Sequence, residues 1–186
     1  MKMKSEELLG ELEAMVRGHR QEAEAMKNWP LKTLNQKPEP DKWSALESFE
    51  HLNRYGDFYL PEIGARINQA KVVKETEFRS GWLGNYFAKM MLPGTKKIKT
   101  FRKMDPSGSV LEMIVLDKFI RQQDMLLELL RQAKRVSLTK TKTSISISKL
   151  VKLKLGDTFR VVVYHNERHI LQAKNAVSLF EKSEAG

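Results

Sequence analysis

The spacing of hydrophobic residues along the chain predicts four long amphipathic helices. In each stretch apolar residues recur at intervals of three and four, the period of a helix with one buried face. The first helix is expected to begin with Ser5 as its N-cap and to end before Pro30. The second is expected to begin near Ser44, whose spacing to Glu47 is that of a capping box. The stripe of the first helix consists of Leu8, Leu12, Met15, Val16, Ala23 and Met26.

The second half of the chain contains the other two long helices and the least regular connection. The third helix is expected to follow a cap at Ser107 or Ser109, and the fourth to begin at Gly156. Residues 81–92 are short, aromatic and rich in methionine, which predicts a short extra helix or lid after the second long helix. Residues 136–155 are rich in Ser, Thr and Lys, and we favour a loop with one helical turn over a short strand.

These elements predict the fold class and the number of domains. Four amphipathic stripes joined by short to moderate connections are typical of an all-α protein, specifically an antiparallel four-helix bundle with one short extra helix. The 186 residues fit a single domain, 1–186. No apolar run approaches the roughly 20 residues needed to span a bilayer, and the N-terminus runs directly into an amphipathic helix. We therefore expect a cytoplasmic protein with no membrane partner.

The net charge of +10 raises the question of a polyanionic partner. Basic residues are scattered, mostly in connections such as Lys96, Lys97, Lys99 and Lys103, and they lack the interleaved aromatic residues of single-strand binders. Nucleic-acid binding is therefore disfavoured, and a solvated basic surface that maintains solubility is preferred. A third alternative is that the positive field gathers a small anionic substrate.

Two of the four histidines indicate half of a metal site. His165 and His169 are four residues apart in a helical pattern, so both imidazoles lie on one helix face. The best candidate for a third ligand is His51. Three neutral imidazoles with a vacant position suit a catalytic divalent metal, and imidazole ligands fit zinc, nickel, iron and copper alike. The chain has no cysteine, which excludes thiolate ligands and a cysteine nucleophile.

The direction of His51 is not decided by periodicity. It lies roughly 150° around the helix from the centre of the main apolar stripe. Either this helix is covered on two sides or His51 is a surface residue. The fourth histidine, His19, falls on the apolar stripe of the first helix, where a hydrogen-bonded core histidine is favoured over a further ligand.

The segment from His165 to His169 does not have the metalloprotease pattern. That motif requires Glu directly after the first histidine, and this chain has Asn166 there. Glu167 is about 200° around the helix from His165 and is expected to point away from the metal. The glycine-rich phosphate loop, the Gly-x-Ser-x-Gly elbow and the Glu-x-x-His pairs of di-iron bundles are also absent from the sequence.

Three stretches together resemble the DinB-like family over nearly the whole chain. They are residues 38–44, which include Trp43 and Ser44, then Glu47 with His51, then residues 155–172. The resemblance implies a four-helix bundle with a divalent metal held by three histidines, here His51, His165 and His169. It favours His51 as a ligand and gives no role to His19.

The resemblance also implies an activity and partners. Characterised relatives transfer a low-molecular-weight thiol to an electrophile, so we expect a metal-dependent thiol S-transferase with a small thiol as co-substrate and a small-molecule electrophile. The alternatives are a metal-dependent hydrolase and a non-catalytic, stress-linked metal-binding dimer scaffold. A homodimer is expected by resemblance. Glu47, Tyr55 and Gln172 are candidates for orienting ligands or substrate around the metal.

Overall fold

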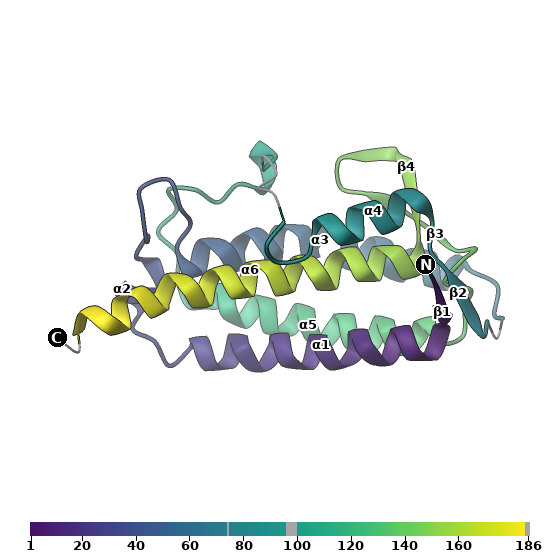
Figure 1. Cartoon of the computed structure of the whole chain (residues 1–186), viewed down its shortest axis with the longest axis horizontal. Helices are drawn as coiled ribbons and strands as arrows, with labels where there is room; N and C mark the ends of the chain where they lie inside the picture. The colour runs from purple at the N-terminus through teal and green to yellow at the C-terminus, as the bar shows by residue number, and fades with distance from the viewer. Residues whose placement is uncertain (74, 96–99, 185–186) are drawn as a thin grey trace.

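Four long helices form most of the structure. The computed structural model describes residues 1–73, 75–95 and 100–184, apart from the side chains of residues 149 and 181–184. Residues 96–99, part of the predicted basic connection, lie outside this description. Helices α1 and α3 each pack against both α5 and α6, and the four run alongside one another (Figure 1). The mostly helical class is therefore confirmed. The bounds are α1 (Ser5–Met26), α3 (Ala45–Gln69), α5 (Ile114–Ala133) and α6 (Leu155–Glu184).

Shorter elements complete the fold and correct the all-α prediction. The extra helix is present as α4 (Trp82–Met90), which packs against α6. Residues 136–155, predicted as a loop, contain an antiparallel hairpin of β3 (Lys142–Ile145) and β4 (Ser148–Lys154). The strands form because Ile145 and Leu153 turn inward onto α4 and α6 while Lys142 and Lys152 are exposed. The remaining elements are α2 (Leu31–Asn35), the 3-10 helix η1 (Arg102–Met104), β1 (Lys2–Lys4) and β2 (Glu77–Arg79), with β1 paired to β2.

The predicted helix caps differ in how well they match the structure. The capping box of α3 is present, with Ser44 and Glu47 each binding the backbone N–H of the other. The predicted caps at Ser107 and Ser109 are wrong, because α5 begins at Ile114 without a side-chain cap. Ser5 is the first residue of α1 and not its N-cap, because strand β1 extends to Lys4. No helix among the described residues is long and apolar enough to cross a membrane.

A polar layer separates two apolar clusters along the length of the helices. One cluster includes Phe159 and Ile63, and the other includes Phe49 and Ile170. Between them lie buried polar groups: the Asn166 side chain donates to the Gln123 side-chain oxygen, and the Gln122 side chain donates to the backbone carbonyl of Asn53. Buried polar groups keep such partners because an unpaired one is costly. The histidines lie in this same layer: the polar side chains are those of His51, Asn53, Gln122, Gln123, His165 and Asn166.

Candidate metal centre

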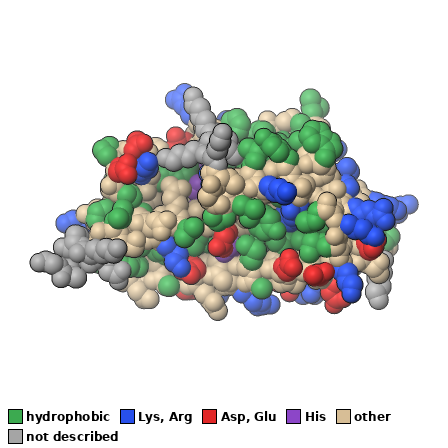
Figure 2. Space-filling model, viewed as in Figure 1, with side chains coloured by type: hydrophobic (Ala, Val, Ile, Leu, Met, Phe, Trp, Pro, Cys, Tyr) green, Lys and Arg blue, Asp and Glu red, His purple; other side chains and the backbone are tan. Residues whose placement is uncertain are grey.

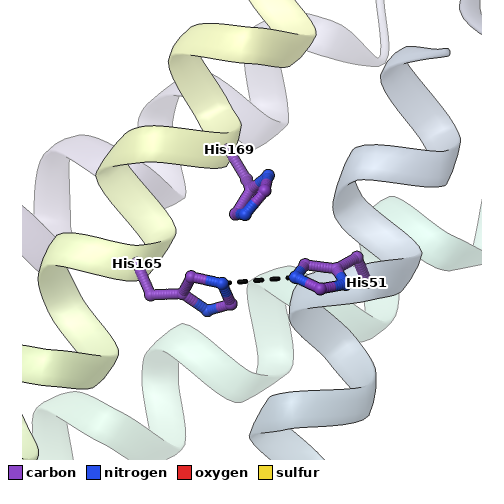
Figure 3. A group of neighbouring side chains, drawn as sticks. All are labelled: His51, His165 and His169. Carbon is purple, nitrogen blue, oxygen red and sulfur yellow. Dashed lines mark hydrogen bonds between the residues drawn. The ribbon is translucent and has the colours of Figure 1, made fainter. Parts of the chain in front are cut away.

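The structure brings His51, His165 and His169 together between α3 and α6. All three rings point into the same space, although His51 is more than a hundred residues away from the other two in sequence (Figure 3). The Nε2 atoms of His51 and His165 are 3.2 Å apart, and one ring nitrogen of each histidine lies within 4.8 Å of the others. His51 is only 3% exposed. His51 is therefore not a surface residue, and α3 is covered on two sides.

The spacing of these nitrogens fits a divalent metal. Two imidazole nitrogens bound to one tetrahedral zinc at the usual bond length are about 3.4 Å apart. The observed 3.2 Å between His51 and His165 is close to that value. With three nitrogen donors and no carboxylate in the cluster, the site has the donor set of a metal centre with a vacant position.

Hydrogen bonds hold two of the rings with Nε2 available for a metal. Nδ1 of His51 lies 2.7 Å from the Met104 carbonyl, and Nδ1 of His169 lies 3.1 Å from Oε1 of Gln172. Both oxygens can only accept, so each Nδ1 carries the proton and each Nε2 keeps its lone pair. Such partners fix the tautomer and ring direction of metal-bound histidines. Gln172, one of the candidate orienting residues, therefore contacts the cluster directly.

Burial keeps the three imidazoles neutral. It lowers the pKa of His51 to about 4 and that of His169 to about 3, and it holds the pKa of His165 well below its usual value. Two further effects lower the pKa of His165 and of His169. One is repulsion from the neighbouring histidines of the cluster, and the other is repulsion from the Arg168 guanidinium. The neutral form is the one that binds a metal.

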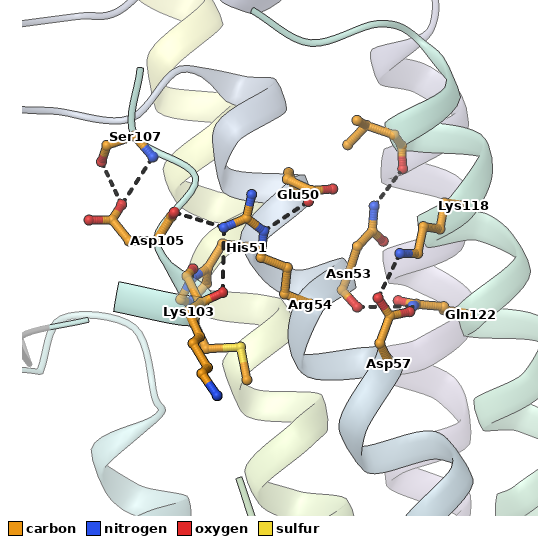
Figure 4. Close-up of polar contacts among 12 residues, drawn as sticks. Glu50, His51, Asn53, Arg54, Asp57, Lys103, Asp105, Ser107, Lys118 and Gln122 are labelled. Carbon is orange, nitrogen blue, oxygen red and sulfur yellow. Dashed lines mark hydrogen bonds and ion pairs between the residues drawn. The ribbon is translucent and has the colours of Figure 1, made fainter. Parts of the chain in front are cut away.

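An arginine on α3 fixes the loop that supplies the carbonyl to His51. Arg54 lies one helical turn from His51, and its guanidinium donates to the backbone carbonyl of Asp105 at 2.7 Å and to that of Lys103 at 3.5 Å (Figure 4). These two carbonyls flank Met104 in sequence. The Met104 carbonyl is therefore held against His51 from both sides.

Aromatic rings surround the cluster. The Trp43 ring lies 4.6 Å from that of His51 and 5.6 Å from that of His169, between centroids. Tyr55 lies 4.9 Å from His51 and 4.7 Å from His165. Burial raises the pKa of Tyr55 to about 12, so its phenol stays protonated at neutral pH. Trp43 belongs to the stretch 38–44 that carries the family resemblance, but it was missed as a residue of the site.

The remaining sequence candidates lie away from the rings. The Glu47 carboxylate binds the backbone of Ser44 and Gly108 and forms an ion pair with Lys37. His19 is a buried core residue whose Nε2 lies 2.7 Å from the Glu167 carboxylate. Glu167 therefore faces α1, and it points away from the cluster, as its helical position predicted.

A cavity of about 920 Å³ adjoins the histidines. Its walls are largely apolar and include residues of α3, α4, α5, α6 and the hairpin, among them Tyr55, Phe87, Leu126, Ile147, Val161 and Leu179. Arg168 also lines it and ties the end of α4 to α6 by donating to the Met90 carbonyl and to Thr95 Oγ1. This arrangement is typical of a small-molecule site, where an apolar pocket surrounds a few polar groups.

The fold and the site define a mostly helical protein with a buried three-histidine cluster suited to a divalent metal. The chain belongs to the DinB superfamily, whose family model matches residues 14–173. Proteins of this superfamily typically bind metal. No curated protein and no solved structure matches the chain.

Proposed function

We propose that this chain is a divalent-metal-dependent enzyme that transfers a low-molecular-weight thiol to an electrophile. His51, His165 and His169 are its metal ligands. The observation that supports this most directly is the convergence of three neutral imidazoles beside an apolar cavity. Zinc, nickel and iron all suit this donor set.

The chemistry follows from the charge of the site. A bound divalent metal deprotonates a coordinating thiol, which makes the thiol a nucleophile at neutral pH. The three imidazoles are neutral, so they leave the positive charge available to an anionic ligand. The rings of Trp43 and Tyr55 pack against the cluster. The protonated Tyr55 phenol is a hydrogen-bond donor for a substrate oxygen.

The cavity accounts for the second substrate. Its apolar wall, formed by residues such as Phe87, Met91 and Val161, favours an electrophile with a hydrophobic body. Gln172 and the Met104 carbonyl hold His169 and His51 in place during turnover. We also propose that the four long helices form an antiparallel four-helix bundle and that the protein works as a homodimer.

Metal analysis and a conjugation assay test this function together. The purified chain is expected to contain about one divalent metal ion per three-histidine site. It should consume a small thiol in the presence of an electrophile such as monobromobimane. His165→Ala should lose both properties. His19→Ala is the matched control, because it removes the remaining histidine, which bonds Glu167 instead of facing the cluster.

The outcomes separate the competing functions. Stoichiometric metal with ester or amide cleavage and no conjugation would replace the transferase with a metal-dependent hydrolase. Metal binding with neither activity would leave a metal-binding scaffold. A folded chain that takes up no zinc, nickel or iron would contradict the proposal as a whole.

A further inference from the structure

The excess of positive charge is confined to two stretches of the sequence. Residues 78–104 and 136–156 contain 12 of the 33 lysines and arginines and none of the 23 aspartates and glutamates. The rest of the chain therefore has 21 basic and 23 acidic residues. The two stretches include α4, η1 and the β3–β4 hairpin, which lie along the upper side of the molecule in Figure 1. Helix α4 and the hairpin thus contain basic residues and no acidic ones.

The same side exposes large apolar residues. Trp82 is 83% exposed and Tyr86, one turn further along α4, is 56% exposed. Leu150 on β4 is 93% exposed. The inward sides of α4 and the hairpin pack against each other, because Leu83 and Phe87 of α4 contact the small cluster that includes Leu153 of β4. Hydrophobic side chains gather over α4 and the hairpin with lysines and arginines among them (Figure 2).

The lysines of the hairpin stand together without acidic partners. Lys142 and Lys154 are directly opposite in the ladder, and Lys152 follows on the outward side. Among the described residues, none of these three lysines forms an ion pair with an acidic group, and Lys154 donates to the Arg79 carbonyl. Like charges opposite each other destabilise a strand pair. A negatively charged surface against the hairpin would offset that repulsion.

We propose that this basic aromatic face, made of Trp82, Tyr86, Lys142, Leu150, Lys152 and Lys154, docks on an anionic lipid surface. Trp and Tyr partition to the headgroup region, and lysines beside them attract anionic lipids. A second copy of the chain is a poor occupant, since a symmetric contact would oppose two faces of the same charge. Nucleic acid is also a poor occupant, since fully exposed aliphatic side chains such as Leu150 find no apolar surface there.

The position of the cavity agrees with a lipid surface. Phe87, Met91 and Ile147 line it and belong to α4, the segment after it and the hairpin. An apolar molecule dissolved in the bilayer would thus meet the cavity from the docked side. The proposal replaces the expectation of no membrane partner, which rested on the lack of an apolar run long enough to span a bilayer and on the amphipathic N-terminal helix. It is independent of the proposed chemistry at the histidines.

Vesicle sedimentation of the full chain tests the docking. The chain should sediment with phosphatidylcholine vesicles that contain phosphatidylglycerol, should remain in solution with pure phosphatidylcholine, and should be released by salt. Two double variants, Trp82→Ser with Leu150→Ser and Lys142→Glu with Lys152→Glu, should each lower the apparent affinity about tenfold or more. Circular dichroism and metal content should be unchanged in both, which separates this result from the proposed catalytic function.

A matched control changes the same charge elsewhere. Arg17→Glu with Lys32→Glu alters exposed residues on α1 and α2, outside the two basic stretches, and should keep the affinity of the original chain. Absence of sedimentation with anionic vesicles at low salt would overturn the proposal, and so would equal sedimentation of the face variants. Binding of an RNA oligonucleotide without vesicle binding would assign the face to nucleic acid. Self-association abolished by the face variants, again without vesicle binding, would assign it to a second copy.

Discussion

Among single residues, the partners of the Nδ1 atoms decide what the imidazoles can do. A histidine whose Nδ1 donates to a fixed oxygen presents Nε2 as a lone pair, and a histidine without such a partner exchanges tautomers. His51 has the Met104 carbonyl and His169 has the Gln172 amide oxygen. The two partners differ in kind, because a backbone carbonyl cannot be removed by substitution whereas a glutamine can. Gln172 is therefore the place to test how much ring orientation contributes.

Gln172→Leu is expected to weaken metal binding about 10- to 100-fold without unfolding the protein. The substitution removes the acceptor of the His169 Nδ1 proton and leaves the ring free to rotate or change tautomer. Competition with a chromogenic chelator measures the affinity. Gln172→Glu is the control, since its carboxylate accepts the same proton and should retain the affinity. Equal affinities for the leucine variant and the original chain would show that Gln172 does not orient the ring.

Glu167→Ala is expected to lower the free energy of unfolding by about 1 kcal/mol while leaving metal content unchanged. Glu167 joins α6 to α1 through His19, and the buried Nδ1 of His19 already lacks a partner among the described residues. The Glu167 side chain is 44% exposed, so water replaces part of the lost bond. Urea denaturation and elemental analysis measure the two properties. Loss of metal from a folded Glu167→Ala variant would show that this carboxylate serves the cluster.

Sequence reasoning reached the ligand candidates and two of their neighbours, Tyr55 and Gln172, but missed others. The pair His165 and His169 follows from helical spacing alone, and His51 required the family resemblance because its angle on the helix was ambiguous. The Met104 carbonyl and the Trp43 ring were missed. The Met104 carbonyl reaches His51 across 53 residues and has no signature in the sequence, and the contact of Trp43 with His169 also joins distant parts of the chain.

Among the elements, α4 is held on α6 by a buried acidic residue. Asp157 accepts from the backbone N–H of Gly81 at 2.8 Å and pairs with Arg160 at 3.2 Å. The Arg160 guanidinium donates in turn to Asn85. Gly84 lies so close that an added Cβ would overlap the Asp157 side chain. The absence of a side chain at residue 84 therefore permits α4 to form the cavity wall.

Gly84→Ala and Gly10→Ala should change stability in opposite directions. At residue 84 the new methyl group meets Asp157, and the resulting overlap is expected to cost about 1–3 kcal/mol. At residue 10 in α1 an added Cβ meets nothing within 4 Å, so higher helix propensity should stabilise by about 0.5–1 kcal/mol. Thermal denaturation followed by circular dichroism gives both values. A neutral or stabilising Gly84→Ala would mean that α4 does not pack on Asp157 as described.

The elements also show where pattern reasoning fails. The long helices were predictable because each has an apolar stripe of helical period over many turns. The hairpin at 142–154 was not, because its inward residues number only a few and the stretch is otherwise Ser, Thr and Lys. What makes it a strand pair is packing of Ile145 and Leu153 against α4 and Val161, a tertiary contact that outweighs local propensity.

For the molecule as a whole, the histidines join two helices, since Nε2 of His51 on α3 lies 3.2 Å from Nε2 of His165 on α6. His51 comes from α3 and the other two histidines come from α6. The layer around them is polar, whereas the two clusters on either side of it along the helices are apolar. Such a layer contributes less hydrophobic stabilisation than the rest of the core. A ligand that binds only the folded arrangement adds its binding free energy to the stability of the fold.

Addition of a divalent metal is therefore expected to raise the melting temperature without changing helix content. At a free metal concentration 100 times the Kd, the stabilisation is about 2.7 kcal/mol. Differential scanning fluorimetry of chelator-treated protein with and without zinc or nickel measures the shift, and far-ultraviolet circular dichroism measures the helix content. The shift should disappear in His51→Ala, because a ligand on α3 is what links the two helices through the ion. If His51→Ala kept the full shift, α6 alone would hold the metal, and α3 would not contribute a ligand to the site.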